Sequence, residues 1–257
     1  MQCCDLLEAG TSALAPHLAE MQSLQILSLG DNRLCSEGAA ALAPCLTHMT
    51  ALTSLDLRWN SAGDEGVCSL APHLASMCWL QTLNLLDNKI GAAGATVLAQ
   101  HITCMSSLRT LDLGRNQVRC KGAEALGGQF AAMPWLEVLN LGWNHIGEHG
   151  AVALAPHLSS MSSLVSLNLA SNKLFSKGVE ALGPHLSKMP KLHTLNLENN
   201  YIGREGESAL QSHLSSMPTL HTLNLQSDSI CSDAESTRSS DLSIVRDHPI
   251  DSSGALE

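Results

Sequence analysis

Leucines recur along the chain in a pattern that repeats every 28 residues. The clearest copy runs from Leu80 to Ile90, with apolar residues at its first, fourth, sixth and eleventh positions and an asparagine at its ninth. That asparagine returns without an insertion or deletion, and we number repeats one to seven by it: Asn32, Asn60, Asn88, Asn116, Asn144, Asn172 and Asn200. A fixed period of this length predicts a solenoid, in which each unit covers the hydrophobic face of its neighbour.

The first half of each unit is predicted to be a short β-strand. Leu83 and Leu85 are two residues apart and point to one buried face, whereas Thr82, Asn84 and Leu86 point to the open face. The asparagine at the bend after the strand can bond to the backbone of neighbouring turns. A buried amide without partners costs about 1 to 3 kcal/mol, so we interpret the seven asparagines as a structural ladder and not as catalytic groups.

The second half of each unit has helical spacing. In the stretch 38–49 the apolar residues are Ala39, Leu42, Leu46 and Met49. Leucine and methionine rows at these positions extend through the units, and we interpret both rows as core packing. Prolines about two turns into a helix predict a kink or an early end; they are Pro16, Pro44, Pro72, Pro156 and Pro184.

These patterns divide the chain into two parts. Residues 1–230 are predicted to form one repeat domain, made of an N-terminal half-unit and eight strand motifs. Residues 231–257 are rich in serine and aspartate and follow neither period, which predicts a disordered tail.

Units such as 144–154 resemble the ribonuclease-inhibitor-like class of leucine-rich repeats. The resemblance covers roughly residues 5–230. The units resemble the C-terminal repeats of NOD-like receptors most and ribonuclease inhibitor itself less, because the inhibitor alternates two unit types of slightly different length, whereas all units here have one length and one type. The resemblance implies an α/β leucine-rich-repeat horseshoe solenoid of 28-residue units, with parallel strands on the concave side and helices on the convex side. It also implies a role in binding other macromolecules.

The charge and composition of the chain limit the kinds of partner that it can bind. The formal charge is −10 and no basic stripe is present, so we expect neither nucleic acid nor a membrane surface as a partner. The chain has no long apolar run and no signal-peptide pattern at its start, which predicts a soluble cytoplasmic protein. Nine cysteines without a CxxC pair indicate free thiols in a reducing compartment.

Sequence motifs for catalysis are missing. No phosphate loop, HExxH helix or GxSxG elbow occurs, so we predict no enzyme and no cofactor. Asp56 and Asp112 stand two strands apart, about 10 Å, near the separation used for inverting glycoside hydrolysis. No insertion forms a cleft around them, and we expect no segment to desolvate either acid.

A histidine row along the helices is the other candidate site; it contains His17, His73, His101, His157, His185 and His213. Stacked helices lie about 8 to 10 Å apart, whereas metal ligands must come within about 2.1 Å of one ion. We therefore predict no shared metal site.

Large side chains interrupt the open face at the two positions before the ladder asparagine. Both tryptophans and both arginines at these positions fall in repeats two to five, and Trp59 and Trp143 are three strands apart, about 14 Å. Tryptophan and arginine are enriched in interface hot spots. The predicted partner-binding residues are Arg58, Trp59, Leu86, Asp87, Asp112, Arg115 and Trp143. The alternative is that each indole only covers a turn, the role that we expect for Trp79 and Trp135.

Two functions follow from these observations and the resemblance. The first is an interaction scaffold that binds a protein or a microbial ligand on its concave face, with innate immune sensing as its setting. The second is a regulator that activates or inhibits a GTPase or another enzyme, because activators of the GTPase Ran use similar repeats. The residues do not indicate an oligomeric state.

Overall fold

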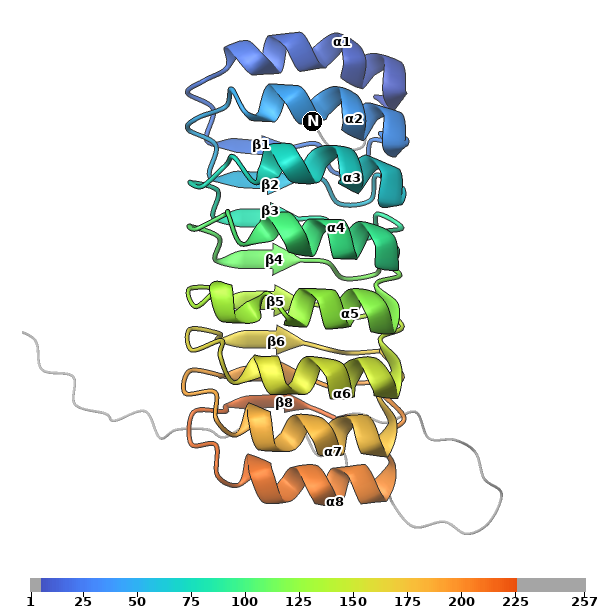
Figure 1. Cartoon of the computed structure of the whole chain (residues 1–257), viewed down its shortest axis with the longest axis vertical. Helices are drawn as coiled ribbons and strands as arrows, with labels where there is room; N and C mark the ends of the chain where they lie inside the picture. Colours follow the sequence, from blue (N-terminus) through green and yellow to red (C-terminus); the bar gives the residue numbers. More distant parts are fainter. Residues whose placement is uncertain (1–5, 226–257) are drawn as a thin grey trace, which may run out of the picture.

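The computed structural model describes residues 6–225, which form one elongated stack of repeats (Figure 1). Each repeat contributes one strand and one helix in alternation. The helices are α1 (Leu7–Glu20), α2 (Cys35–Leu46), α3 (Gly63–Leu74), α4 (Ala92–Ile102), α5 (Arg119–Gly127), α6 (Gly147–Leu158), α7 (Phe175–Leu186) and α8 (Gly203–Leu214), with a short 3-10 helix η1 (Phe130–Ala132). The strands are β1 (Ile26–Ser28), β2 (Ser54–Asp56), β3 (Thr82–Asn84), β4 (Thr110–Asp112), β5 (Val138–Asn140), β6 (Ser166–Asn168), β7 (Thr194–Asn196) and β8 (Thr222–Asn224).

The eight strands form a single parallel sheet in sequence order. Each residue pairs with the residue one period later, as Leu55 does with Leu83 and Leu83 with Leu111. The helices stack in the same order and form a second layer over one face of the sheet (Figure 1). The predicted fold class is therefore confirmed. The predicted tail at 231–257 and the end of the predicted repeat domain at 226–230 lie outside the described residues.

Leucine and methionine side chains fill the space between the two layers. Leu83 and Leu85 are fully buried, whereas Thr82, Asn84 and Leu86 are half-buried on the other side of the sheet. We call that side, which faces away from the helices, the strand face. The methionine row is buried from Met49 to Met217; Met21 is exposed because no earlier repeat among the described residues covers it.

The prolines do not shorten the helices, so the early end, one of the two predicted effects, is not found. Helices that contain a proline, such as α2 and α7, end at Leu46 and Leu186, and the proline-free α8 ends at the equivalent Leu214. Pro44 lies on the exposed side of α2, so the carbonyl group that it leaves without a helical partner can bond to water. The one early end is that of α5, where two glycines follow each other at 127 and 128.

The loop from strand to helix has an unusual backbone conformation. In repeat two, Trp59, Ser61 and Gly63 have φ angles of 56°, 53° and 64°, and most other repeats show the same alternation of positive φ. Backbone hydrogen bonds to the next repeat fix this path: the Trp59 N–H donates to the Leu86 carbonyl at 2.8 Å. Because the loop is held by the backbone, the side chain at each position is free to vary.

Candidate partner-binding surface

The ladder asparagines hold the loops beneath this surface. Asn116 is 3% exposed, and its Oδ1 accepts hydrogen bonds from the N–H groups of Asn88 (3.0 Å) and Ile90 (2.9 Å) in the preceding repeat. Its Nδ2 donates to the carbonyls of Leu85 and Leu113, both at 2.9 Å. One amide thus satisfies backbone groups of two repeats in a region that water does not reach.

A second polar row lies on the strand face. From Asp56 to Asn196, each Asn or Asp of this row accepts the N–H two residues later through its own Oδ1, as Asp112 does from Gly114 at 2.8 Å and Asn84 from Leu86 at 3.0 Å. These side chains are therefore folded back onto their own backbone. They support the turn that carries the next residues of the surface.

Burial raises the pKa of the Asp112 carboxyl above its ordinary range, despite the hydrogen bonds from Gly114 and Asn140 that lower it. This corrects the expectation that nothing desolvates the acids of this row. The cover comes from the neighbouring repeats: Leu86 and Asn140 converge with Asp112 above Gly114, each within 3.1 Å of where a Cβ atom would stand. Asp56 instead pairs with Arg58, with 3.5 Å between Oδ2 and Nε.

Four of the predicted binding residues form two cation–π pairs, each made of an arginine and a tryptophan. The guanidinium of Arg58 lies 5.2 Å from the ring centroid of Trp59, its neighbour in the chain. The guanidinium of Arg115 lies 5.2 Å from the ring of Trp143 in the next repeat. The indoles are 45% and 42% exposed, so each presents much of its surface to solvent beside a fixed positive charge.

Backbone hydrogen bonds join these two pairs through the residues between them. The N–H of Trp59 donates to the carbonyl of Leu86, that of Asp87 to Gly114 (2.9 Å), and that of Arg115 to Gly142 (2.8 Å). The seven predicted residues thus lie on four consecutive repeats without a gap.

The two tryptophans have an unusual backbone conformation, which the sequence alone did not predict. Trp59 and Trp143 have φ angles of 56° and 55°, in the left-handed region that bulky residues rarely adopt. Equivalent positions hold Asp31, Ser171 and Asn199, and small polar residues tolerate this conformation better. The tryptophans are therefore placed where local backbone preference disfavours them.

Two exposed aromatic residues were missed by the sequence analysis. Phe175 and Tyr201 also have positive φ, and their rings stack with centroids 5.8 Å apart. Of the seven aromatic residues in the chain, the four with positive φ are the exposed ones. The sequence did contain a sign of this site, because Phe175 stands at a position that is glycine in other repeats, such as Gly147 and Gly203. By contrast, Trp79 is half-buried against the core, the role expected for it.

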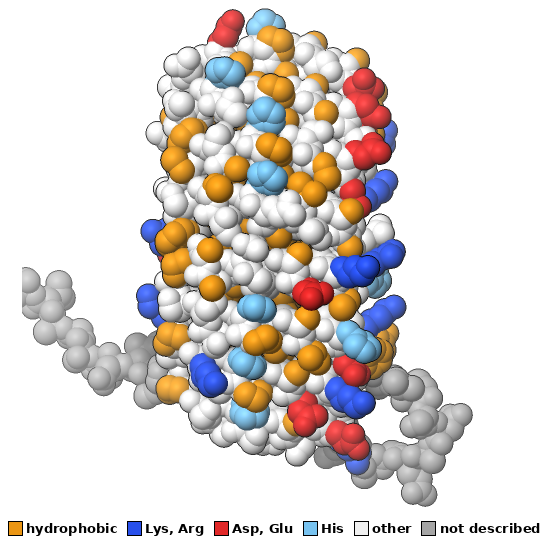
Figure 2. All heavy atoms as spheres, viewed as in Figure 1, with side chains coloured by type: hydrophobic (Ala, Val, Ile, Leu, Met, Phe, Trp, Pro, Cys, Tyr) orange, Lys and Arg blue, Asp and Glu red, His pale blue; other side chains and the backbone are white. Residues whose placement is uncertain are grey.

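The histidine row runs over the helices as a column (Figure 2). His157 packs above Gly127 of the preceding helix, and His213 packs in the same way above Gly183. Burial lowers the pKa of His185, whose Nδ1 is enclosed without a hydrogen-bond partner. Within residues 6–225 no three His, Cys, Asp or Glu side chains are placed to hold one metal ion.

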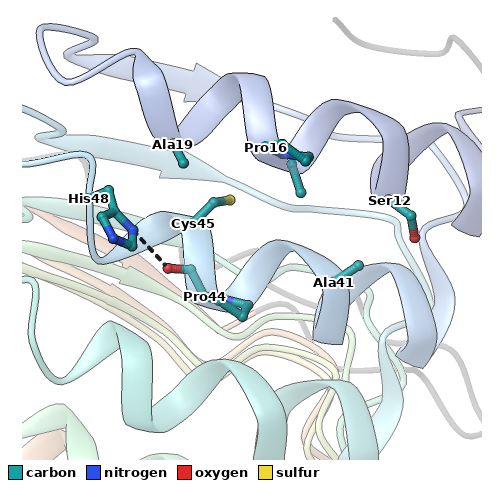
Figure 3. A pocket seen from close by; sticks show the side chains of 8 residues that line it. Ser12, Pro16, Ala19, Ala41, Pro44, Cys45 and His48 are labelled. Carbon is teal, nitrogen blue, oxygen red and sulfur yellow. Dashed lines mark hydrogen bonds between the residues drawn. The ribbon is translucent and has the colours of Figure 1, made fainter.

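An apolar groove lies between α1 and α2 (Figure 3). It is lined by Pro16, Pro44, Cys45 and His48 among others. Burial raises the pKa of the Cys45 thiol to about 11, and its Sγ donates to the Leu42 carbonyl at 2.8 Å. The His48 ring contacts the Pro44 carbonyl instead (3.3 Å), so the groove holds no thiolate–imidazole pair.

Comparison with known proteins defines the class. The model of the family described as "Leucine Rich repeat" matches residues 20–43, 48–71, 76–99, 104–127, 132–155 and 160–183, more than half of the chain. The chain therefore belongs to the leucine-rich repeat family. No curated protein matches it. No helix among residues 6–225 has the length and apolar character to cross a membrane.

Two solved structures are similar to the chain. Actin-binding site 2 of leiomodin-1 shares 18% identity over 53% of this chain and 79% of its own, with a TM-score of 0.45. An internalin from Listeria monocytogenes shares 23% identity over 81% of this chain and 63% of its own, with a TM-score of 0.49. Similarity at this level does not indicate a partner for this chain.

Proposed function

We propose that the protein is a non-enzymatic scaffold that binds a partner protein on the strand face of repeats two to five. The binding surface consists of Arg58, Trp59, Leu86, Asp87, Asp112, Arg115 and Trp143. One observation carries the proposal: two exposed tryptophans stand in the left-handed conformation, each next to an arginine.

The energetics favour binding over a structural role for the indoles. A bulky residue in the left-handed region costs about 1 to 2 kcal/mol, and an indole that stays about half exposed offsets little of this by burial. At an interface, the same indole loses its water and contacts a partner over a large area. Truncating such a residue there costs about 2 kcal/mol or more.

The biological settings implied by the resemblance to NOD-like receptors and to GTPase activators are innate immune sensing and enzyme regulation. We propose a cytoplasmic location with them, because Cys35, Cys78 and Cys104 are exposed free thiols and such thiols persist in a reducing compartment. The identity of the bound partner would distinguish innate immune sensing from enzyme regulation. A GTPase would favour regulation, and a microbial protein would favour sensing.

The test is differential capture from a cell lysate by immobilised protein. The double variant Trp59→Asn/Trp143→Asn carries the residue of the equivalent Asn199, which suits the left-handed conformation. The control variant, Asn196→Ala/Glu198→Ala, changes the strand face of repeat seven. We expect one protein to be captured by the wild type and the control but not by the tryptophan variant, whose free energy of unfolding is no lower than that of the wild type. Capture by all three, or a less stable tryptophan variant, would contradict the proposal.

A further inference from the structure

We infer that the loops at the starts of α7 and α8 form a second docking surface, which binds an acidic segment of a partner protein bearing apolar side chains. We call this surface the α7–α8 edge; it consists of Lys173, Phe175, Lys177, Tyr201 and Arg204. It lies outside the strand-face site of repeats two to five and does not depend on that proposal.

The stacked pair of Phe175 and Tyr201 is not needed to form the loops or to fill the core. Phe175 and Tyr201 are 44% and 38% exposed, and their rings stack at an interplanar angle of 22°. Their φ angles are 55° and 54°. The position of Phe175 is held by glycine with positive φ at Gly147 and Gly203, so the loop forms without any side chain there. A bulky ring at this place adds exposed apolar surface at a conformational cost.

Three cations border the pair. Lys173, Lys177 and Arg204 are exposed in the stretches 173–177 and 201–205, which span the two loops and the starts of the two helices, and Glu205 is the one acidic residue in these stretches. The whole chain has a formal charge of −10, so this local excess of cations runs against its composition. Figure 2 shows Lys and Arg side chains along the lower part of the right-hand margin, where the later helices begin, with acidic side chains between them; above them the side chains are mainly acidic.

The chemistry of the edge favours an acidic polypeptide over a nucleic acid. Exposed rings beside three cations match a segment that alternates carboxylates with aliphatic or aromatic side chains, through apolar contact and charge attraction. A single-stranded nucleic acid would need free ring faces for base stacking and a continuous basic track for its phosphates. Here each ring covers one face of the other, and Glu205 interrupts the cations.

The experiment uses a short fluorescein-labelled peptide of glutamates with leucines interspersed, and measures its anisotropy as the full chain is added. We expect salt-sensitive binding that weakens about tenfold or more in Phe175→Gly/Tyr201→Ser. These replacements are the residues of Gly147 and Ser61, so folding is preserved. Lys173→Ser/Lys177→Glu, which carries the residues of Ser61 and Glu65, is expected to weaken binding similarly.

Three controls make the proposal falsifiable. Trp59→Asn/Trp143→Asn is expected to bind the peptide as the wild type does, which separates this surface from the strand face. A peptide with serine in place of leucine is expected to bind more weakly. Equal binding of the serine peptide, unchanged binding by the Phe175→Gly/Tyr201→Ser variant, or displacement of the peptide by oligothymidylate would overturn the inference.

Discussion

At the scale of single residues, the buried amide of Asn116 joins two repeats through five backbone groups. Replacing Asn116 with alanine leaves the N–H groups of Asn88 and Ile90 without their acceptor in a closed layer. We expect a loss of about 3 kcal/mol in the free energy of unfolding, measured by chemical denaturation.

Asn84→Ala is the matched comparison. Its Oδ1 accepts one N–H, that of Leu86, on the half-buried strand face where water can replace it. We expect a loss of about 1 kcal/mol or less. Equal losses in the two variants would show that the buried and open faces do not differ in the way described.

The carboxyl of Asp112 predicts a dependence of stability on pH. Because burial raises its pKa in the folded state, the ionised form destabilises the fold at neutral pH, and this penalty disappears below the pKa of both states. Asp112→Asn keeps an acceptor for the Gly114 N–H and removes the charge. We expect a higher Tm than that of the wild type at neutral pH and no gain at about pH 3, below the ordinary aspartate pKa of about 3.9.

Thermal unfolding at the two pH values checks this prediction. Asp56→Asn serves as the control, because it removes the partner of Arg58 and is expected to give no gain at neutral pH. A gain for Asp112→Asn that is the same at both pH values would contradict the role of its charge.

The sequence predicts the face of a residue better than its electrostatic environment. Alternation within one repeat was enough to place Leu83 and Leu85 in the core and Asn84 on the open side. The cover over Asp112 comes from Leu86 in the preceding repeat and Asn140 in the next one. Such cover depends on how side chains lean across strands, which a one-dimensional pattern does not contain.

At the scale of elements, the position of a proline on the helix surface decides its effect. Gln100 in α4 occupies the place of Pro44 in α2, on the exposed side near the end of the helix. We expect Gln100→Pro to reduce the free energy of unfolding by about 1 kcal/mol or less, against about 3 kcal/mol for an interior proline. Ala99→Pro is the control, because it frees the carbonyl of the buried Ala95; denaturation curves that coincide for the two variants would contradict this reasoning.

The existence and order of the elements followed from the sequence period. What it did not predict was that the prolines leave the helix ends unchanged while Gly127 and Gly128 end α5 early. Helix ends depend on solvent access to freed carbonyls and on backbone flexibility, and both act locally within an otherwise identical repeat.

At the scale of the whole molecule, the repeat constrains the backbone and leaves the loop side chains free. Within residues 6–225, every position equivalent to Trp59 has a positive φ, whatever residue stands there. The sequence alone showed that Trp59 and Trp143 interrupt a polar row, but not that the backbone disfavours them. The same φ values are what distinguish Phe175 and Tyr201 from packing residues such as Phe130, which is buried in η1.

The affinity of the captured partner for Trp59→Asn/Trp143→Asn, measured by isothermal titration calorimetry, tests the central claim most directly. We predict that the dissociation constant rises about tenfold or more relative to the wild type, because both exposed indoles become buried in the interface. An unchanged dissociation constant in this variant, together with weaker binding by Asn196→Ala/Glu198→Ala, would contradict the claim and place the partner on the other half of the strand face.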